Sequence, residues 1–411
     1  MIRNEIAGIA VAELAKEYQT PFFVYDATPI RRRISELRQF DGIRYAQKAC
    51  SNLSILRLIK NEGCVVDCVS AFEIKRALAA GFDTVKSVIP PIVYTADIFD
   101  RESLDLVIEH DIPVNCGSID MISQYGTRAP GRNITLRINP GFGHGHSQKT
   151  NTGGDQSKHG IWFRLIDECR MTAKKYGLKI TGLHTHIGSG TDFEHLAKLC
   201  QSFEQFVPQF GSDIEMISCG GGLPIPYKKD DPSIDVEKYY QLWDQTRKKL
   251  EGELKHEIHL EIEPGRYIVA ESGFLVAEIR AVKKQAENLF YLVDAGFNNL
   301  ARPILYGAYH PISISTANAT GEEVEVVIGG PLCESGDIFT QEEGGFVAKR
   351  KLPLAKVGDY LILEIAGAYG SVMGSNYNSK PLTAEILVDA GKAKLIRRRQ
   401  TFEQLVQNEV F

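Results

Sequence analysis

Two hydrophobic periods alternate over the first two thirds of the chain. Short apolar runs, of the kind found in buried parallel strands, are separated by stretches in which apolar residues recur at helical spacing. The apolar runs cover residues 43–47, 64–69, 87–94, 112–116, 134–139, 180–185, 214–219 and 257–262. The helical stretches cover residues 52–62, 71–80, 97–109, 163–176, 193–209 and 236–250, and a shorter one follows residue 116. Eight strands that alternate with helices predict an α/β fold, a (β/α)8 barrel of the TIM type.

An open, doubly wound sheet is the competing arrangement for the same alternation. It would place a glycine-rich, phosphate-binding turn after its first strand. The stretch from Arg44 to Leu53, where that turn would fall, contains no glycine. We therefore favour the barrel.

The pattern changes after Gly273, where strand-like alternation replaces long helical stretches. The alternating runs cover residues 274–282, 289–294, 322–328, 359–365, 384–388 and 393–396. They predict a second, all-β domain, a sandwich or a barrel. A short apolar run at residues 21–25 precedes the first predicted helix. We assign residues 27–272 to the barrel and residues 1–26 and 273–411 to the β domain.

The composition is that of an ordinary globular protein with room for two domains: 411 residues, 43% hydrophobic and 24% charged. The net charge of −5 gives no basic face for nucleic acid. No run of 18 apolar residues occurs, and the first 20 residues lack the apolar core of a signal peptide. The eight cysteines form no Cys-x-x-Cys pair, so we expect neither a zinc site nor a disulfide framework. A reduced, cytoplasmic location fits these features.

Lys48 follows the first predicted barrel strand directly, and a helical pattern opens at Asn52. In parallel barrels the carboxyl ends of the strands carry the catalytic residues. A lysine there, beside an apolar run, can form a Schiff base with a cofactor. A solvent-exposed lysine with no function, at the end of a strand, would have the same local sequence. The other residues at the carboxyl ends of the strands are needed to distinguish the two interpretations.

Histidines and glycines follow the sixth and seventh predicted strands. His184 and His186 are two residues apart and share one face of an extended strand. They could ligate a metal, although no third ligand is evident nearby; one ring could stack on an aromatic cofactor, and one could be a core histidine. Gly220–Gly222 could bring backbone amides to an anion, or could form a tight turn that needs positive φ.

Glu263 follows the eighth predicted strand, and Arg266 comes after it and a Pro-Gly pair. The carboxylate could pair with Arg266, or it could keep a pyridine nitrogen protonated and so make the ring a strong electron sink. Ser70 and Glu73 follow the second strand. All these side chains would share one mouth of the barrel, and that common placement favours a cofactor site.

Two glycine-bounded loops stand out in the second predicted domain. One runs from Gly329 to Asp337 and contains Cys333, and the other runs from Gly367 to Gly370. Such loops usually only connect strands. A cysteine in a polar loop is nevertheless unusual, because cysteine prefers burial.

Taken in order, the motifs resemble one family. A lysine after the first barrel strand is followed by His-Ile-Gly-Ser-Gly, Gly-Gly-Gly, Glu-Pro-Gly-Arg, Cys-Glu-Ser-Gly-Asp and Gly-Ala-Tyr-Gly. Over roughly residues 20–400, the chain resembles the pyridoxal-phosphate decarboxylases that have an alanine-racemase-type barrel. The segments 294–299, 302–307 and 375–379 are similar to substrate-binding segments of that family. One departure is Gln47, where many members have valine.

The resemblance implies a role for each matched residue. Lys48 would bind pyridoxal 5′-phosphate covalently, Glu263 would pair with the pyridine nitrogen, and His186 would stack on the ring. Cys333 would be the proton donor and, with Lys48, one of two catalytic residues. The residues implied in cofactor binding are Lys48, His186, Ser189, Gly222, Glu263, Gly265, Arg266 and Tyr369. Those implied in substrate binding are Arg266, Arg302, Tyr306, Glu334 and Tyr369, and no metal is implied.

The resemblance also implies a reaction and an assembly. The expected reaction is the decarboxylation of meso-2,6-diaminopimelate to L-lysine and CO2, the last step of lysine biosynthesis. The expected assembly is a homodimer with shared active sites, in which Cys333 reaches the site of the other subunit. The expected partner is this small amino acid, without nucleic acid or membrane.

Three alternatives stay open at this point. The first is another enzyme of the same fold, a racemase or a decarboxylase of ornithine or arginine. Glu263 speaks against a racemase, which needs a softer electron sink, and Arg302 with Glu334 suits a distal end that carries both a carboxylate and an ammonium. The second is a non-catalytic carrier of the same cofactor, which is usually shorter. The third is a metal-dependent barrel hydrolase that uses His184 and His186.

Overall fold

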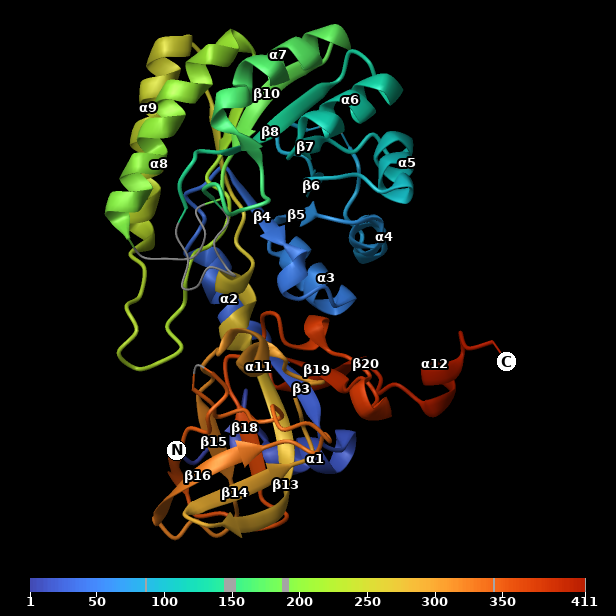
Figure 1. Ribbon diagram of the computed structural model, residues 1–411, viewed down its shortest axis with the longest axis vertical. Coiled ribbons are helices and arrows are strands. Elements are labelled where there is room, and N and C mark those ends of the chain that lie inside the picture. The colour runs from blue at the N-terminus through green and yellow to red at the C-terminus, as the bar shows by residue number, and fades with distance from the viewer. Residues whose placement is uncertain (86, 144–152, 187–191, 343, 411) are drawn as a thin grey trace. The chain divides into compact units, whose positions relative to one another are not determined.

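The computed structural model describes residues 1–85, 87–143, 153–186, 192–342 and 344–410. The chain divides into two compact units, and Figure 1 shows their elements coloured along the sequence. The barrel unit comprises Arg32–Ile225 and Pro232–Tyr267. The β unit comprises Met1–Arg31, Pro226–Asp231 and Ile268–Phe411. Among the described residues, no helix combines the length and the apolar character that a membrane crossing requires.

Eight parallel strands form the closed sheet of the barrel unit. They are β4 (Gly42–Ala46), β5 (Val65–Cys68), β6 (Ile92–Ala96), β7 (Val114–Cys116), β8 (Asn133–Asn139), β10 (Lys179–His184), β11 (Met216–Ser218) and β12 (His259–Ile262). Each strand pairs with the next one in this order, and β12 pairs with β4, so the sheet closes on itself. A short strand, β9 (Ile161–Trp162), pairs with β8. The predicted (β/α)8 barrel is confirmed.

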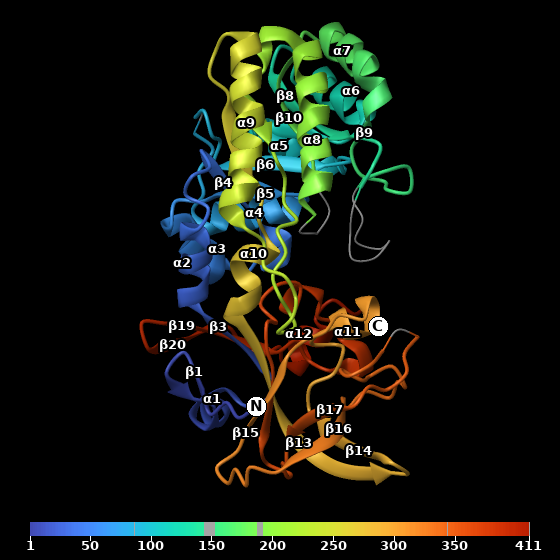
Figure 2. The same cartoon turned by 90° about the vertical axis from the view of Figure 1, so that its left-hand side faces the viewer.

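Helices connect the strands and cover the outside of this sheet (Figure 1). They are α3 (Leu53–Asn61), α4 (Ala71–Ala80), α5 (Arg101–Glu109), α6 (Ile119–Arg128), α7 (Ile166–Lys175), α8 (Phe193–Phe206) and α9 (Val236–Leu254). Helix α2 (Ala27–Ser35) precedes the first barrel strand, and the short helix α10 (Arg266–Val269) follows the last one. Figure 2 shows α8 and α9 side by side, and the two helices are in contact. Ser70 and Ser118 cap α4 and α6 by accepting a hydrogen bond from an amide of the first turn.

Strand β6 starts at Ile92, whereas the apolar run in the sequence predicted a start at residue 87. Pro90 and Pro91 explain the difference. Proline has no N–H group to donate to a neighbouring strand, so it is excluded from the interior of a sheet.

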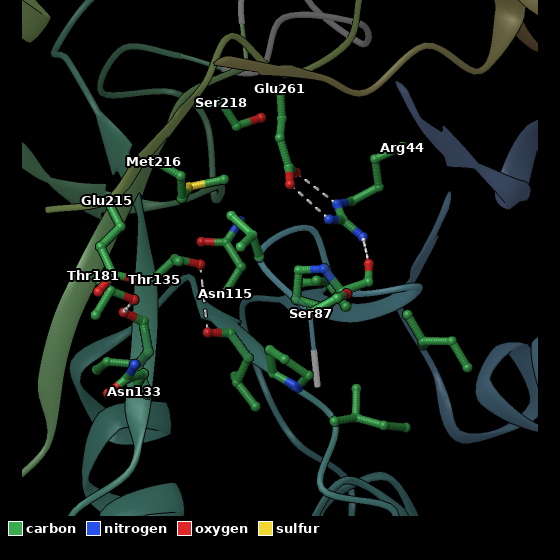
Figure 3. Close-up of a pocket in the computed structure, with 18 of the residues that line it drawn as sticks. Arg44, Ser87, Asn115, Asn133, Thr135, Thr181, Glu215, Met216, Ser218 and Glu261 are labelled. Carbon is green, nitrogen blue, oxygen red and sulfur yellow. Dashed lines mark hydrogen bonds and ion pairs between the residues drawn. The ribbon is translucent and has the colours of Figure 1, made fainter. Parts of the chain in front are cut away.

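The barrel interior contains charged side chains, which come from residues within the predicted apolar runs. Arg44 on β4 donates two hydrogen bonds of 2.9 Å to the carboxylate of Glu261 on β12, and both side chains are 2% exposed. Figure 3 shows this pair at a cavity of about 440 Å³. The cavity lies at the amino ends of the strands, since Ile92, Asn133 and His259, which begin three of them, line it.

A second, mostly antiparallel sheet forms the β unit. Its order is β17-β16-β14-β13-β3-β19-β20, and β18 pairs with β13 and β15. The strands are β3 (Phe22–Asp26), β13 (Gly273–Gln285), β14 (Asn288–Val293), β15 (Ile312–Ser315), β16 (Glu323–Gly329), β17 (Arg350–Pro353), β18 (Tyr360–Leu363), β19 (Ala384–Asp389) and β20 (Lys392–Arg397). Two further strands, β1 (Glu5–Ile6) and β2 (Ile9–Ala10), pair with each other, and the unit also has three short helices, α1 (Val11–Tyr18), α11 (Arg302–Tyr306) and α12 (Phe402–Val406).

The start of the chain belongs to this second sheet. Strand β3 lies between β13 and β19, as Figure 2 shows, and pairs with both. Phe22 and Val24 on β3 pack in one core with Val276 on β13 and Ile386 on β19. The predicted second domain built on strands is therefore confirmed, although the sequence pattern did not predict β15 and β17.

Candidate active site

Lys48 lies in a three-residue turn, Gln47–Ala49, that follows β4 directly. Its side chain is exposed, whereas both neighbours are buried. The Gln47 side-chain amide donates to the carbonyl oxygens of Asp67, 3.2 Å away, and Glu73, 3.1 Å away. These bonds tie the turn to β5 and α4, so the backbone fixes where the lysine side chain begins.

Lys48 lines a cavity of about 810 Å³ at the carboxyl ends of the strands. Arg137 from β8 and His159 line the same cavity, as does Asp97, which follows β6. Asp97 accepts hydrogen bonds from His159 Nδ1 at 2.8 Å and from the Gly160 amide at 2.9 Å. Burial raises the pKa of Asp97, but these two bonds and Arg137 hold it below its usual value. Polar side chains from several strand ends thus share one cavity.

Glu263 follows β12 and is 8% exposed. The Ser218 hydroxyl donates to its Oε1 at 3.1 Å, and His184 Nε2 lies 3.0 Å from its Oε2. Burial by itself raises the pKa of this carboxyl, but His184, Arg44 and Arg137 outweigh burial and lower it to about 2. Glu263 is therefore a charged carboxylate inside the barrel.

His184 is the core histidine of the two that the sequence singled out. It is 2% exposed, and its Nδ1 lies 2.9 Å from the side-chain nitrogen of Asn115. Its other ring nitrogen faces Glu263. The sequence suggested Arg266 or a cofactor nitrogen as the partner of Glu263. The structure places His184 beside this carboxylate, and service to a cofactor stays a prediction.

His186 accepts a hydrogen bond at Nδ1 from the Gly221 amide, 3.1 Å away. Burial, reinforced by the charges of Arg137 and Lys48, lowers the pKa of His186 well below its usual value. The ring is therefore neutral. A neutral, flat imidazole suits contact with an aromatic ring better than a cation that must be desolvated.

Close packing requires glycine at Gly220 and Gly221, and Gly222 has a positive φ. Gly220 and Gly222 have φ of +65° and +96°. A Cβ on Gly220 would lie 2.0 Å from the Thr185 carbonyl oxygen, and one on Gly221 would lie 2.4 Å from that of Glu263. Packing therefore accounts for the turn, and a phosphate contact of Gly222 stays a prediction.

Gly265 packs against the turn that carries Lys48. A Cβ there would lie 3.1 Å from the Ala46 carbonyl oxygen and 3.2 Å from Ala49 Cβ. Arg266 follows as the first residue of α10. Ser189, the remaining predicted phosphate ligand, lies outside the described residues.

Arg302 opens α11 in the β unit and is 5% exposed. Its Nη1 donates to the Tyr227 hydroxyl at 3.0 Å and lies 2.9 Å from His310 Nε2. The guanidinium also lies over the Tyr227 ring, 4.9 Å from its centroid. Tyr306, at the other end of α11, is 40% exposed. The helix thus presents one fixed arginine and one accessible tyrosine.

The loop with Cys333 and Glu334 is held by a buried carboxylate that the sequence did not single out. Asp337 accepts hydrogen bonds from the amides of Leu332 at 2.8 Å and Phe297 at 2.7 Å. Both Cys333 and Glu334 are exposed, whereas the other seven cysteines are buried. The loop therefore presents a thiol and a carboxylate to its surroundings from a fixed backbone.

Tyr369 is half-buried and has a φ of +56°, which is rare for a residue with a side chain. Gly367, two residues earlier, packs so tightly that a Cβ would lie 1.9 Å from the Val269 carbonyl oxygen. This turn of the β unit is thus strongly constrained, which is typical of a positioned functional side chain.

The predicted residues fall into two groups, one in each unit. Lys48, His186, Gly222, Glu263, Gly265 and Arg266 belong to the barrel unit, and Arg302, Tyr306, Cys333, Glu334 and Tyr369 belong to the β unit. Among the described residues, no group of three or more His, Cys, Asp or Glu side chains could hold a metal ion.

Comparison with known proteins assigns the chain to a family. Residues 28–270 match the family described as "Pyridoxal-dependent decarboxylase, pyridoxal binding domain". The chain belongs to the pyridoxal-dependent decarboxylases. Within that family, diaminopimelate decarboxylase of Escherichia coli (strain K12) is 51% identical over an alignment of 411 positions, which covers 99% of this chain and 98% of that one.

Solved structures of this decarboxylase family have the same fold as this chain. A crystal structure of diaminopimelate decarboxylase has a TM-score of 0.93 and 51% identity, and the match covers 97% of this chain and 95% of that chain. The diaminopimelate decarboxylase of Helicobacter pylori, solved in complex with L-lysine, has a TM-score of 0.87 and 31% identity. That match covers 97% of this chain and 98% of the other.

The barrel residues fit the pyridoxal cofactor of this decarboxylase family. Lys48 supplies an exposed amine at the large cavity, Glu263 a buried carboxylate that stays charged, and His186 a neutral ring. An exposed amine and a buried anion are the two groups that a pyridoxal ring needs at its aldehyde and its nitrogen.

Sequence reasoning missed several polar residues of the decarboxylase barrel. Arg137 and Asn115 have a local signal, because each interrupts an apolar run that forms a buried strand. The pair of Asp97 and His159 has none, since the two residues are far apart in the sequence and meet only when the barrel closes.

Proposed function

We propose that this protein catalyses the decarboxylation of meso-2,6-diaminopimelate to L-lysine and CO2 with pyridoxal 5′-phosphate as cofactor. One observation carries the proposal: 51% identity to the diaminopimelate decarboxylase of Escherichia coli over almost the full length of both chains. The reaction is the last step of lysine biosynthesis from this diamino diacid. Glu263 supports it against a racemase, because a charged carboxylate favours a strong electron sink.

When bound, the cofactor supplies a ring that withdraws electrons from the bond to the departing carboxylate. Lys48 would hold the cofactor covalently through its amine, and Glu263 would accept a hydrogen bond from the protonated ring nitrogen. His186 would cover one face of the ring. Ser189, Gly222, Gly265 and Arg266 would hold the phosphate.

Residues of the β unit would bind the substrate and deliver a proton. Arg302 would bind the distal carboxylate, and Glu334 would accept from the distal ammonium. The bonds from Arg302 to Tyr227 and His310 support this role, because they fix the guanidinium before substrate arrives. Tyr306, Tyr369 and Arg266 would complete the contacts, and the Cys333 thiol would protonate the carbon that loses CO2.

We infer that the enzyme is a cytoplasmic homodimer with shared active sites. An exposed cysteine is costly for a reduced protein unless it has a use, and Cys333 is exposed on a loop fixed by Asp337. Reaching the site of a second subunit would give this thiol such a use. All eight cysteines are free, which suits a reducing compartment.

The proposed function is tested by product analysis. Purified protein with added pyridoxal 5′-phosphate is incubated with meso-diaminopimelate, and CO2 and lysine are measured. We expect both products in equal amounts and neither from Lys48→Ala. Release of CO2 without lysine, or no reaction with the loaded protein, would overturn the proposal.

A further inference from the structure

Three polar side chains inside the barrel have no role in the chemistry described so far: His184 and Ser218 contact Glu263, and Asn115 contacts His184. They are Asn115 on β7, His184 on β10 and Ser218 on β11. We propose that these three are positioning residues: together they keep Glu263 ionised and fix the direction in which it meets the cofactor's ring nitrogen. The proposal rests on the proposed function, because it concerns that same carboxylate.

Asn115 selects the tautomer of His184. The side-chain nitrogen of Asn115 lies 2.9 Å from His184 Nδ1, and an amide nitrogen can only donate. Nδ1 must therefore accept, which leaves the ring proton on Nε2, the atom 3.0 Å from Glu263 Oε2. If the Asn115 amide were reversed, Nδ1 would carry the proton, and two acceptors, Nε2 and Oε2, would face each other.

The contact of His184 with Glu263 is short but bent, because the N–H bond points away from the line between the two atoms. It therefore acts as a dipole close to a charge. Ser218 supplies the hydrogen-bond donor. The Gly220 amide donates to Ser218 Oγ at 3.2 Å, which uses a lone pair of the hydroxyl and leaves its proton for Glu263 Oε1, 3.1 Å away. Oε1 thus has a hydrogen-bond donor in Ser218, Oε2 has the N–H dipole of His184 beside it, and both oxygens keep a lone pair for the cofactor.

The surroundings of these side chains argue against a purely structural role. Barrel interiors are usually filled by branched apolar side chains. Here Asn115 and Ser218 line the cavity of about 440 Å³, where Figure 3 shows them facing the same space as Thr135 and Met216. Asn115 is 2% exposed, and its Oδ1 has no hydrogen-bond partner in the described part of the chain. Burying such an amide costs stability, so its place beside His184 indicates a functional reason.

Several other charged or titratable groups act on Glu263 from the strands around it. Arg44 on β4 and Arg137 on β8 favour its charged form, whereas Asp67 on β5, Glu261 on β12 and Cys219 after β11 are acidic neighbours, and Glu261 is paired with Arg44. Loss of the His184 donor leaves all of these in place. The carboxylate should then take up a proton at a higher pH than in the wild type, without losing its charge altogether.

The test compares two side chains of equal length at position 184 in the holoenzyme. His184→Gln keeps an N–H group near the position of Nε2, and His184→Met keeps the volume but removes the donor. Thr181→Val is the matched control, because Thr181 lines the same cavity outside the group of three. The measurements are kcat and KM against pH, the absorbance of the bound cofactor against pH, the cofactor dissociation constant and the melting temperature.

We expect His184→Met to lower kcat about tenfold to a hundredfold, as for a buried charge that loses a polar neighbour, with little change in KM. The acidic limb of its kcat profile and the pH at which the cofactor spectrum changes should both move to higher pH. Its cofactor dissociation constant should rise about tenfold. His184→Gln should recover most of the loss, and Thr181→Val should match the wild type.

If His184→Met and Thr181→Val have the same kcat–pH profile and the same cofactor absorbance at each pH, the proposal is overturned and the proposed function is unaffected. Failure of the proposed function is a different result, because the wild type would then make no lysine. If His184→Met does not fold, Ser218→Ala and Asn115→Leu replace it. Each of these variants should move the acidic limb of the kcat–pH profile to higher pH. An unchanged acidic limb in both variants would overturn the proposal.

Discussion

At the scale of single residues, the chemistry depends first on one exposed lysine. Lys48 is exposed between two buried neighbours and lines the large cavity, so its amine is accessible while its backbone is fixed. We expect Lys48→Ala to abolish covalent cofactor attachment and activity. Borohydride reduction of the loaded wild type, followed by peptide mapping, should label Lys48. A label on another lysine would contradict the assignment.

Glu263 permits a second prediction at this scale. Glu263→Gln keeps the shape of the side chain but loses its charge, so it cannot hold a ring nitrogen protonated, and its NH2 group would face His184 or Ser218 in place of an accepting oxygen. Because that charge matters mostly in the transition state, we expect kcat to fall by about 10²–10³ while KM changes little. Steady-state kinetics on the purified, cofactor-loaded variant provide the measurement. A kcat near that of the wild type would show that the electron-sink argument is wrong.

Sequence could place residues at the strand ends but could not predict which side chains lie behind them. Lys48 and Glu263 follow apolar runs, so the barrel topology alone puts both at the carboxyl ends. Asn115 and Ser218 sit inside such runs on β7 and β11. Their contacts with His184 and Glu263 depend on how barrel strands align across the closed sheet, and hydrophobic period contains no information about that alignment.

At the scale of elements, the ion pair of Arg44 with Glu261 links the first and last strands of the barrel. Glu261→Met would leave a buried guanidinium without its partner, so we expect unfolding free energy to fall by about 3–5 kcal/mol. The double variant Arg44→Met, Glu261→Met should recover much of that loss. Denaturant unfolding followed by circular dichroism measures both variants.

An exposed ion pair provides the control. Lys75 and Glu102, on α4 and α5, are 47% exposed, so Glu102→Gln should change the unfolding free energy by less than about 1 kcal/mol. If Glu261→Met costs no more than this control, the pair in the barrel is not a structural link between β4 and β12.

The sequence predicted the helices and strands correctly where the spacing of apolar residues is clear. All eight barrel strands overlap the predicted runs, because strands buried on both faces are mostly apolar. The start of β6 was wrong by several residues, because the apolar run continues through Pro90 and Pro91, which cannot join a ladder. Strands β15 and β17, with four residues each, were not predicted.

At the scale of the whole molecule, the proposed shared sites can be tested by complementation. Lys48→Ala and Cys333→Ala chains should each be inactive. After subunit exchange, a mixed dimer would contain one site with both defects and one site with neither, so an equal mixture should recover roughly a quarter of wild-type activity. No recovery, with exchange demonstrated by differently labelled chains, would argue for sites built within one chain.

The substrate panel is the measurement that tests the central claim most directly. Arg302 and Glu334 would recognise an L-amino-acid end, so the reacting end of meso-diaminopimelate would be its D-centre. Values of kcat/KM should therefore be high for this isomer, low for the L,L isomer, and at least about a hundredfold lower for lysine and ornithine, which lack the distal carboxylate and would forfeit a charge-assisted contact. Comparable kcat/KM values for ornithine and meso-diaminopimelate would contradict the account.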